Sequence, residues 1–410
     1  MLMPALEITL TTPTYGGESM GRLEDGRAVF VPFALPGETV RVRLVEQKRG
    51  FARAALLEVV RPSPQRIAPK CLHFGVCGGC HYQILPYPEQ LKLKESILRD
   101  QLVRIGKIAA PPVKSMLPSP EPWNYRNHVQ FHVSPEGRLG FVAAGNSQAV
   151  MPISECHLPE TTLNMLWPQI ELEAGTSLDR VSLRAGDGVI LILESDSVET
   201  PEMEIEAGIS VVHLSEDDVV VLAGEDHIIM DVLDRRFRVS AGSFFQVNTA
   251  MAAKMVEHLI TKLRVLASTT LLDVYCGAGL FSAFFASHVK RVVGIEISAS
   301  ACQDFSANLD EFANVELYEA PAEIVLAGID IHPEVVIVDP PRAGLDKQVL
   351  DALVTLGPKM LAYVSCDPST LARDAARLIT GGYTLMEVTP FDLFPQTYHI
   401  ESISIFERGD

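Results

Sequence analysis

The sequence contains no long apolar run. None of its hydrophobic stretches reaches the ~20 residues that a membrane-spanning helix requires, so we expect no transmembrane segment. Cysteine is also scarce, with 7 among 410 residues, and the N-terminus shows no secretory signal. A secreted, disulfide-stabilised protein is therefore disfavoured, and a cytoplasmic protein of two or three domains is expected.

Basic charge is in short supply as well. The formal net charge is −18, which argues against a nucleic-acid partner because Lys and Arg make the phosphate contacts. The acid is concentrated, however: residues 151–230 hold 17 Asp and Glu against 2 Lys and Arg, whereas residues 1–70 hold 7 against 10. The N-terminal part is therefore left free to meet an acidic partner. Further positive charge is expected nearby from Lys70, Lys92, Lys94, Arg99, Arg104, Lys107 and Arg126.

A complete dinucleotide-binding fingerprint is missing too. Thr270–Tyr275 is predicted as a strand, Cys276–Gly279 as a tight turn and Leu280–His288 as a helix. Ser282 stands where the third glycine of G-x-G-x-x-G belongs. The next strand, Arg291–Glu296, ends in an acid that can accept hydrogen bonds from ribose hydroxyls. This order, with two further strands behind it, favours an S-adenosylmethionine (SAM) methyltransferase sheet over an NAD-binding one.

One cysteine follows the end of a predicted strand. Met360–Val364 is an apolar run, Pro368 stops it in a turn, and Cys366 lies between them. The preceding strand, Val335–Val338, ends in the same way at Asp339, so the two strand ends are expected to face one cleft. A thiol there can act as a nucleophile if its pKa is lowered or a base stands nearby. The competing interpretation is a packed core cysteine, which is the commoner case.

Four other cysteines form a separate group. They have the spacing C-x5-C-x2-C with a fourth member after a long gap: Cys71, Cys77, Cys80 and Cys156. Four thiolates suit either zinc or an iron–sulfur cluster. The spacing matches neither the paired C-x2-C of zinc ribbons nor the C-x3-C-x2-C of radical SAM enzymes. Cys276 and Cys302 are expected to be small packed residues.

The N-terminal 62 residues alternate apolar and polar side chains. The predicted strands are Leu6–Leu10, Arg27–Phe33, Thr39–Val45 and Ala52–Val60. Within the third, Val40 and Val42 should face inward while the arginines between them face out. Small barrels of this kind bind nucleic acid along a basic face, although a solvated face is the plainer reading of these arginines.

Residues 242–410 resemble the RNA uracil-5-methyltransferase family. The motifs that carry the resemblance are Gly242–Asn248, the glycine turn, Asp339–Leu345, Ser365–Pro368 and His399–Ser402. The N-terminal segment resembles the TRAM domain, an RNA-binding barrel, through Tyr15–Gly21 and Leu35–Glu38. Asn124–Asn127 also resembles a family motif, with a plain turn as the alternative.

The resemblance implies roles for several residues. Cys366 would add to C6 of uracil and make C5 nucleophilic, and Glu401 would be the base that removes the C5 proton. SAM would be bound by Gln246, Tyr275, Glu296 and Asp339; Gln246 and Asp339 could also contact the uracil, and the sequence does not divide these two roles. The four grouped cysteines, Cys71, Cys77, Cys80 and Cys156, would hold a 4Fe–4S cluster. Leu280 departs from the pattern, because many relatives have a polar residue there. From the residues alone, Glu401 would pass for a solvent-facing position in an alternating strand.

We therefore predict an α/β protein with three domains: a TRAM-like barrel over residues 1–62, a central α+β domain with the cluster over 63–235, and a Rossmann-like methyltransferase domain over 236–410. Its mostly parallel seven-stranded sheet would be completed by an antiparallel strand carrying Glu401. The expected reaction is methyl transfer from SAM to C5 of a uridine in structured RNA, 23S ribosomal RNA being favoured. The chain's oligomeric state is left open, with a monomer favoured.

Three alternatives are considered. A tRNA uracil-5-methyltransferase would use the same chemistry. A non-catalytic RNA-binding or ribosome assembly factor would fit if the site had decayed, for which Leu280 is the hint. A cytosine-5 RNA methyltransferase would carry its nucleophile in a Pro-Cys pair, but Arg342 follows Pro341 here.

Overall fold

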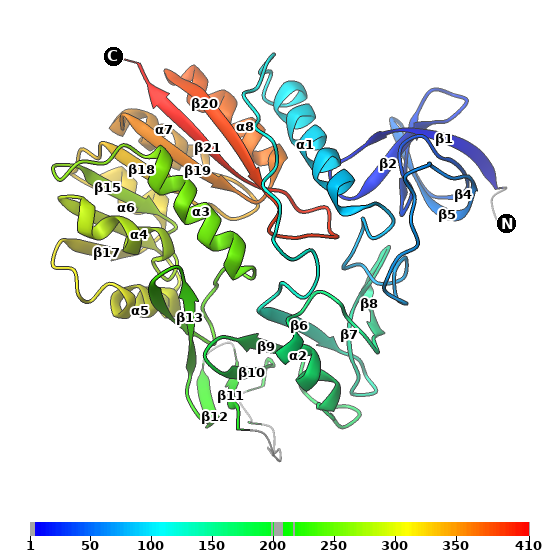
Figure 1. The fold of residues 1–410 in the computed structure, drawn as a ribbon, viewed down its shortest axis with the longest axis horizontal. Helices are drawn as coiled ribbons and strands as arrows, with labels where there is room; N and C mark the ends of the chain where they lie inside the picture. Colours follow the sequence, from blue (N-terminus) through cyan, green and yellow to red (C-terminus); the bar gives the residue numbers. More distant parts are fainter. Residues whose placement is uncertain (1–4, 198–199, 201–207, 216–217, 410) are drawn as a thin grey trace. The chain divides into compact units, whose positions relative to one another are not determined.

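The computed structural model describes residues 5–197, 200, 208–215 and 218–409 (Figure 1). The chain divides into two compact units. Unit one contains the chain up to Ile97 together with Phe141–Cys156 and Phe394–His399; unit two contains Leu98–Gly140, His157–Leu393 and the chain from Ile400 onward. Among the described residues, no helix is both long and apolar enough to cross a membrane.

Unit one contains the predicted barrel. Its strands are β1 (Leu6–Pro13), β2 (Glu18–Arg22), β3 (Ala28–Pro32), β4 (Thr39–Gln47) and β5 (Phe51–Arg61). They close in the order β1-β2-β3-β5-β4, because β1 pairs with both β2 and β4. Val40 and Val42 are fully buried while Arg41 and Arg43 are exposed, as the alternation predicts. The strand β2 was not predicted.

Glu38 fixes the way in which the chain enters β4. Its side chain is fully buried and accepts hydrogen bonds from the backbone nitrogens of Leu35 (2.8 Å) and Ser63 (3.1 Å) and from Nε of Arg66 (2.8 Å). Gly37 has φ +88°, a conformation that glycine adopts without strain. The Leu35–Glu38 motif therefore has a structural purpose: it ties the barrel to the chain that follows it.

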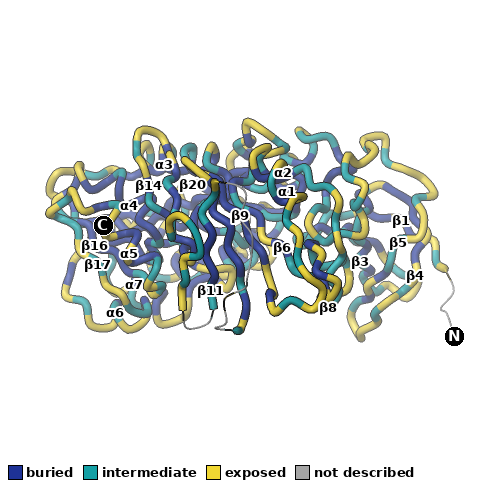
Figure 2. The backbone as a smooth tube through the Cα atoms, turned by 90° about the horizontal axis from the view of Figure 1, so that it is seen from below, coloured by how far each residue is buried: buried dark blue, intermediate teal, exposed yellow. Residues whose placement is uncertain are grey.

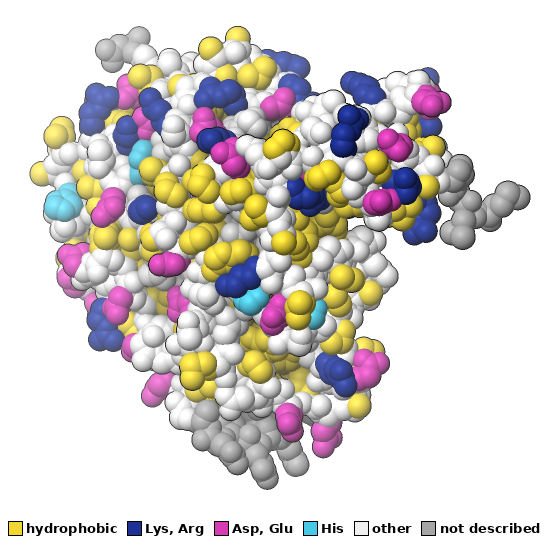
Figure 3. All heavy atoms as spheres, turned by 45° about the vertical axis from the view of Figure 1, so that its right-hand side comes forward, with side chains coloured by type: hydrophobic (Ala, Val, Ile, Leu, Met, Phe, Trp, Pro, Cys, Tyr) yellow, Lys and Arg dark blue, Asp and Glu magenta, His cyan; other side chains and the backbone are white. Residues whose placement is uncertain are grey.

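Two outer arginines of the barrel are paired with acids. Arg41 lies 2.5 Å from Glu58, and Arg53 lies 2.6 Å from Glu18. Figure 3 shows charged side chains of both signs interspersed on the face that it draws. Such exposed pairs contribute little to stability, since water screens them, and an incoming phosphate can compete for the arginines.

Helix α1 (Tyr87–Arg104) contains a lysine whose environment differs from the sequence-based prediction. Lys94, expected to add surface charge, is instead fully buried and its Nζ donates to the Phe394 carbonyl at 2.9 Å. The prediction for Lys94 was wrong because the helix is covered on that side by residues distant in sequence.

A mixed sheet lies in the middle of the sequence. Its strand order is β12 (Val219–Ala223), β11 (Ser210–Leu214), β10 (Val189–Glu194), β9 (Arg180–Ala185), β6 (His128–Val133), β7 (Leu139–Ala143) and β8 (Asn146–Pro152). Short helices α2 (Thr161–Leu166) and η1 (Trp167–Gln169) follow β8 in sequence. Figure 2 shows β9 as deeply buried. A hairpin of β13 (His227–Val232) and β14 (Arg235–Ser240) leads into the last part of the chain.

The C-terminal sheet has the predicted mostly parallel form. Its order is β17 (Val315–Glu319), β16 (Arg291–Glu296), β15 (Thr270–Val274), β18 (Val335–Val338), β19 (Met360–Ser365), β21 (Glu401–Arg408) and β20 (Tyr383–Phe391). The first five strands are parallel, and β21 pairs antiparallel with both β19 and β20, so β21 alone runs against the other strands; this confirms the predicted mostly parallel sheet. The order reverses between β15 and β18, and such switch points place ligands at the carboxyl ends of the strands.

Helices connect the strands of this sheet (Figure 1). They are α3 (Thr249–Lys262), α4 (Leu280–Phe285) with η2 (Ala286–His288), α5 (Ala299–Asn308), α6 (Ala322–Gly328), α7 (Lys347–Leu356) and α8 (Pro368–Thr380). Because helices cover the parallel strands, those strands are apolar on both faces: all of β18 and β19 is buried. The residues that end these strands are therefore the ones available for chemistry.

Candidate active site

The glycine turn joins β15 to α4 in strained backbone. Tyr275, Gly277 and Gly279 all have positive φ, and a Cβ on Gly279 would lie 2.4 Å from Leu309 Cδ1. Glycine is therefore required at 279 for both conformation and space. The carboxylate of Glu296, at the end of β16, accepts a hydrogen bond from the Gly277 backbone nitrogen at 3.0 Å. The structure thus brings the predicted ribose-binding acid against the glycine turn.

Buried carboxyl groups cluster beside this turn. Asp273 of β15 is fully buried, and it accepts a hydrogen bond from Ser282 Oγ at 2.6 Å. Burial raises the pKa of Asp273 to about 6. Burial, together with the charges of Asp273 and Glu296, raises the pKa of Asp339 to about 7. Carboxyl groups gathered in this way at one edge of the sheet are suited to a cation, such as a sulfonium or ammonium group.

Tyr275 lies at the same strand end. It is half-buried, and burial followed by the charges of Glu323, Asp346 and Asp374 raises its pKa to about 12. The phenol is therefore neutral at physiological pH and can donate a hydrogen bond. Of the four predicted SAM residues, Tyr275, Glu296 and Asp339 thus end three neighbouring strands of one sheet.

Cys366 and Glu401 lie opposite each other. In the antiparallel pairing of β19 with β21, Ser365 is opposite Ser402, so one step further the register brings Cys366 opposite Glu401. Burial, then the charges of Glu401 and Asp339, raises the pKa of Cys366 to about 12, while Arg342 lowers it. Glu401 is only 8% exposed. The nucleophile and base candidates therefore share one site with Asp339.

The turn after Cys366 is fixed by a helix cap. Asp367 is the N-cap of α8, and its Oδ1 accepts from the backbone nitrogens of Ser369 (2.8 Å) and Thr370 (3.1 Å). Pro368 occupies the first helical position, where no backbone donor is needed. The Cys366–Pro368 sequence therefore holds the thiol at the junction of a buried strand and a capped helix.

Gln246 lies in an irregular segment, residues 241–248, between β14 and α3. Its described contact is made by the backbone carbonyl, which accepts from Asn127 Nδ2 at 3.0 Å. Two residues earlier, Phe244 is 68% exposed, an unusual environment for a large aromatic ring. No role for Phe244 or Arg342 is predicted from the sequence. Both residues lie in the family motifs Gly242–Asn248 and Asp339–Leu345, but the exposure of Phe244 and the charge effect of Arg342 on Cys366 follow only from the folded chain.

The four grouped cysteines all lie in unit one, and Cys80 interacts electrostatically with the other three. Burial raises the pKa of Cys80 to about 12, and Cys156, Cys77 and Cys71 add to the rise by their charges. Backbone N–H groups point at two of the sulfurs: His73 N lies 3.4 Å from Cys71 Sγ, and Gly79 N lies 3.3 Å from Cys77 Sγ. N–H···S bonds of this kind are typical of cluster-binding thiolates. Within the described ranges, no group of His, Cys, Asp or Glu side chains has the spacing of a metal site.

The segment around Cys156 is tied to the loop around Cys71. Glu155 Oε1 accepts from the Leu72 backbone nitrogen at 2.7 Å, and Ser154 N donates to His73 Nε2 at 3.0 Å. The donor chemistry therefore fits an iron–sulfur cluster or zinc equally. Cys276 and Cys302 are buried as predicted, at 7% and 3% exposure.

Comparison with known proteins identifies the class. Residues 203–408 match the family described as tRNA (Uracil-5-)-methyltransferase, and residues 5–57 match the TRAM domain. An uncharacterized RNA methyltransferase of Thermosynechococcus vestitus is 35% identical, covering 98% of this chain and 97% of its own. Another from Halalkalibacterium halodurans is 32% identical, covering 98% and 96%. The chain belongs to the RNA uracil-5-methyltransferase family, and carries an N-terminal TRAM domain.

A solved structure shares the fold over the whole chain. The tRNA (uracil-54, C5)-methyltransferase of Pyrococcus abyssi, solved with S-adenosyl-L-homocysteine, superposes with a TM-score of 0.75 at 24% identity. The match covers 97% of this chain and 100% of that one. The protein is thus a SAM-dependent RNA (uracil-5-)-methyltransferase, which decides against a non-catalytic role.

Proposed function

We propose that this enzyme methylates C5 of a uridine through a covalent bond between Cys366 and C6 of the base. The observation that carries the proposal is the register of β19 and β21, which sets Cys366 opposite Glu401. Uracil C5 is too weak a nucleophile to attack a methyl sulfonium unaided. Addition of a thiolate at C6 moves the electrons of the C5=C6 bond into an enolate, and C5 then becomes reactive.

The reaction needs a nucleophile and a base in succession. Cys366 Sγ forms the bond to C6, and C5 then takes the methyl group, leaving S-adenosylhomocysteine. Glu401 next removes the C5 proton, and the returning electron pair expels Cys366 as thiolate, which restores the C5=C6 bond. Asp339, Glu296 and Tyr275 would bind SAM. Gln246, which the resemblance placed with SAM, is assigned here to the target base together with Phe244, whose exposed ring two residues earlier would stack on that base.

The Cys366 thiol does not begin in its reactive form. Its pKa is raised to about 12 by burial and by Glu401 and Asp339. A cationic group bound among these carboxylates would lower it again, as Arg342 already does in part. The proposal therefore includes activation of the thiol only when the methyl donor is in place.

Trapping with 5-fluorouridine RNA tests the covalent step. Fluorine at C5 cannot leave as a proton, so the wild type should form a denaturation-resistant, methylated adduct. Cys366→Ala should abolish it, and Cys302→Ala, the loss of a buried thiol on α5, should not. Glu401→Gln should accumulate methylated adduct with ordinary uridine RNA. An adduct that persists in Cys366→Ala would overturn the proposal.

For the substrate we propose 23S ribosomal RNA, with the grouped cysteines holding a 4Fe–4S cluster and the protein acting in the cytoplasm. The electrostatic interaction of Cys80 with the other three cysteines, and the N–H···S bonds to Cys71 and Cys77, support the cluster. The rival substrate is tRNA. It is favoured by the Pyrococcus abyssi enzyme, whose whole chain matches this one, so that the barrel alone does not distinguish the two. Mapping 5-methyluridine in both RNA classes from cells with and without this enzyme decides between them.

A further inference from the structure

Phe244 and Gln246 lie in the segment of residues 241–248, which forms neither helix nor strand. Backbone polar groups in such a segment must find partners elsewhere, because unpaired buried carbonyls are unfavourable. Four carbonyl oxygens at and near this segment are held by two residues of the middle sheet region. The position of the exposed Phe244 ring is therefore set from outside the methyltransferase sheet.

Arg184 of β9 supplies the first set of contacts. Its Nη1 donates to the Ser240 carbonyl at 2.9 Å and its Nη2 to the Ser243 carbonyl at 2.7 Å. The side chain is 4% exposed, and although burial lowers its pKa to about 10, it remains charged at neutral pH. A buried guanidinium spanning two carbonyls fixes both the position and the direction of the turn before Phe244.

Asn127 supplies the second set. Its Nδ2 donates to the Gln246 carbonyl at 3.0 Å and to Thr249 Oγ1 at 2.9 Å, and its backbone nitrogen donates to the Val247 carbonyl at 2.9 Å. Asn127 is 3% exposed. It is the last residue of the Asn124–Asn127 motif, and this motif has no role in the reaction proposed above.

The two residues lie side by side because of strand register. His128, the first residue of β6, pairs with Arg184 of β9, and the Ala185 backbone nitrogen donates to the Asn127 carbonyl at 2.8 Å. Asn127 and Arg184 therefore stand at the same end of one antiparallel pair. They hold the segment on both sides of Phe244.

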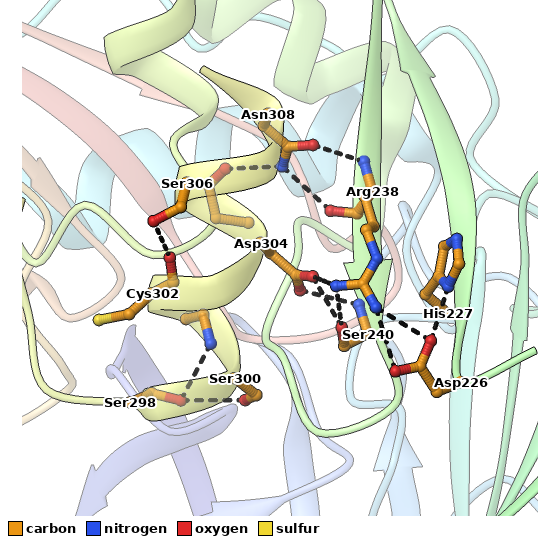
Figure 4. A network of polar contacts seen from close by, with 12 residues as sticks. Asp226, His227, Arg238, Ser240, Ser298, Ser300, Cys302, Asp304, Ser306 and Asn308 are labelled. Atoms are coloured by element: carbon orange, nitrogen blue, oxygen red, sulfur yellow. Dashed lines mark hydrogen bonds and ion pairs between the residues drawn. The ribbon is translucent and has the colours of Figure 1, made fainter. Parts of the chain in front are cut away.

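Helix α5 also contacts Ser240, the last residue of β14, directly before the segment (Figure 4). Asp304, fully buried, accepts from the Ser240 backbone nitrogen at 2.8 Å and from Ser240 Oγ at 2.7 Å. It also accepts from Arg238 Nη1 at 2.6 Å, and Arg238 in turn binds Asp226. The N-cap of α5, Ser298, lies two residues after Glu296. The start of the segment therefore has hydrogen bonds both from the middle sheet and from the helix that follows the ribose-binding acid.

We propose that Asn127 and Arg184 are positioning residues for the substrate base: they touch neither base nor cofactor, and act by holding Phe244 and Gln246 in place. The proposal rests on the proposed function, because it assigns the segment to the uracil. It predicts that substitution of Asn127 lowers kcat/KM for the RNA substrate and leaves the affinity for the cofactor unchanged.

Asn127→Ala tests this against a matched control. Asn314 also donates from Nδ2 to two backbone carbonyls, those of Ala286 (2.9 Å) and Val289 (3.0 Å), outside the segment. We expect Asn127→Ala to lower kcat/KM for RNA at least tenfold, while the Kd for S-adenosylhomocysteine changes less than twofold. Asn314→Ala should leave both unchanged. Should Asn127→Ala fold poorly, Asn127→Asp keeps the volume but cannot donate to the Gln246 carbonyl.

A double-mutant cycle distinguishes positioning from general destabilisation. If Asn127 acts through Phe244, Asn127→Ala should lower kcat/KM by less than twofold in a Phe244→Ala background. Equal losses in both backgrounds, or a loss of cofactor affinity that matches the loss of activity, would overturn the inference. Failure of the wild type to form the Cys366 adduct would instead overturn the proposed function, so the two failures are distinguishable.

Discussion

The raised pKa of Cys366 has a measurable consequence in the ligand-free enzyme. A thiol of ordinary pKa, near 9, is about one-tenth thiolate at pH 8, whereas a pKa of about 12 reduces the thiolate about a thousandfold. Iodoacetamide reacts only with the thiolate. We therefore expect Cys366 to be alkylated about a thousandfold more slowly at pH 8 than an ordinary thiol of the same exposure.

Glu401→Gln should reverse part of this effect. The substitution removes the second-largest cause of the shift after burial, and loss of one neighbouring charge lowers a pKa by about one unit. Alkylation of Cys366 at pH 8 should then be about tenfold faster, with the whole pH profile displaced by the same amount. Because burial is the largest cause, the pKa should stay above its ordinary range.

Peptide mapping by mass spectrometry follows this reaction at Cys366 alone, from pH 7 to pH 10. Glu407→Gln is the matched control, since Glu407 lies on the same strand, β21, and pairs with Arg264 at the strand's far end. Equal profiles for wild type and Glu401→Gln, or an equal displacement in Glu407→Gln, would refute the electrostatic coupling of the two site residues.

Three further predictions concern stability and metal. Asp273→Asn should raise the free energy of unfolding by up to about 3 kcal/mol above pH 6 and should leave it unchanged below pH 4. The reason is that the folded-state pKa of about 6 exceeds the unfolded value of 3.8, so the stability of the wild type falls as the pH rises through that window. Urea unfolding at several pH values, followed by tryptophan fluorescence, checks this, and a gain that does not depend on pH would contradict it. Anaerobically purified protein should absorb near 400 nm and lose this band in Cys80→Ser; a colourless protein that contains zinc counts against the cluster. Glu38→Gln should destabilise the barrel by about 3 kcal/mol by breaking a buried pair, against less than about 0.5 kcal/mol for the exposed Glu58→Gln, both measured by thermal unfolding.

The strand ends of the active site could be predicted because they follow from local sequence. Val335–Val338 and Met360–Val364 are apolar runs stopped by proline, and the structure has strands there, ending just before Asp339 and Cys366. Parallel strands are covered on both faces, so a continuous apolar run is their expected signature. What the runs could not supply is the order of the strands, which decides which ends are neighbours.

The alternating pattern of polar and apolar residues around Glu401 predicts the wrong exposure for its strand. The alternation of Ser402 and Ser404 with isoleucines suggests a half-exposed strand, yet Ser402 and Ser404 are 1% and 0% exposed. Strand β21 lies between β19 and β20, so both of its edges are paired, and its first six residues are all buried, which shows that both of its faces are covered. Serine is small enough to be buried on one of these faces. The resemblance, and not the pattern, pointed to Glu401.

The hydrogen bonds that hold the segment around Phe244 were beyond sequence reasoning for a different reason. Asn127 precedes the Gln246 carbonyl that it binds by 119 residues, and Arg184 is 59 residues from Ser243. Such contacts are set by the pairing of β6 with β9, and no local pattern reports them. The motif of residues 124–127 could be noticed, but its purpose requires the register.

The carboxyl groups of the site have two electrostatic effects. Asp339 and Glu401 disfavour the Cys366 thiolate, which alone would make a poor nucleophile. The same groups, with Asp273 and Glu296, favour a bound cation. Both effects are compatible with catalysis if the thiolate forms only beside a positive charge, because the cation then offsets the repulsion that otherwise keeps the proton on sulfur. With the roles proposed above, the thiol would be unreactive in the empty enzyme and reactive once the methyl donor is bound, so electrostatics would couple the activation of Cys366 to the binding of SAM.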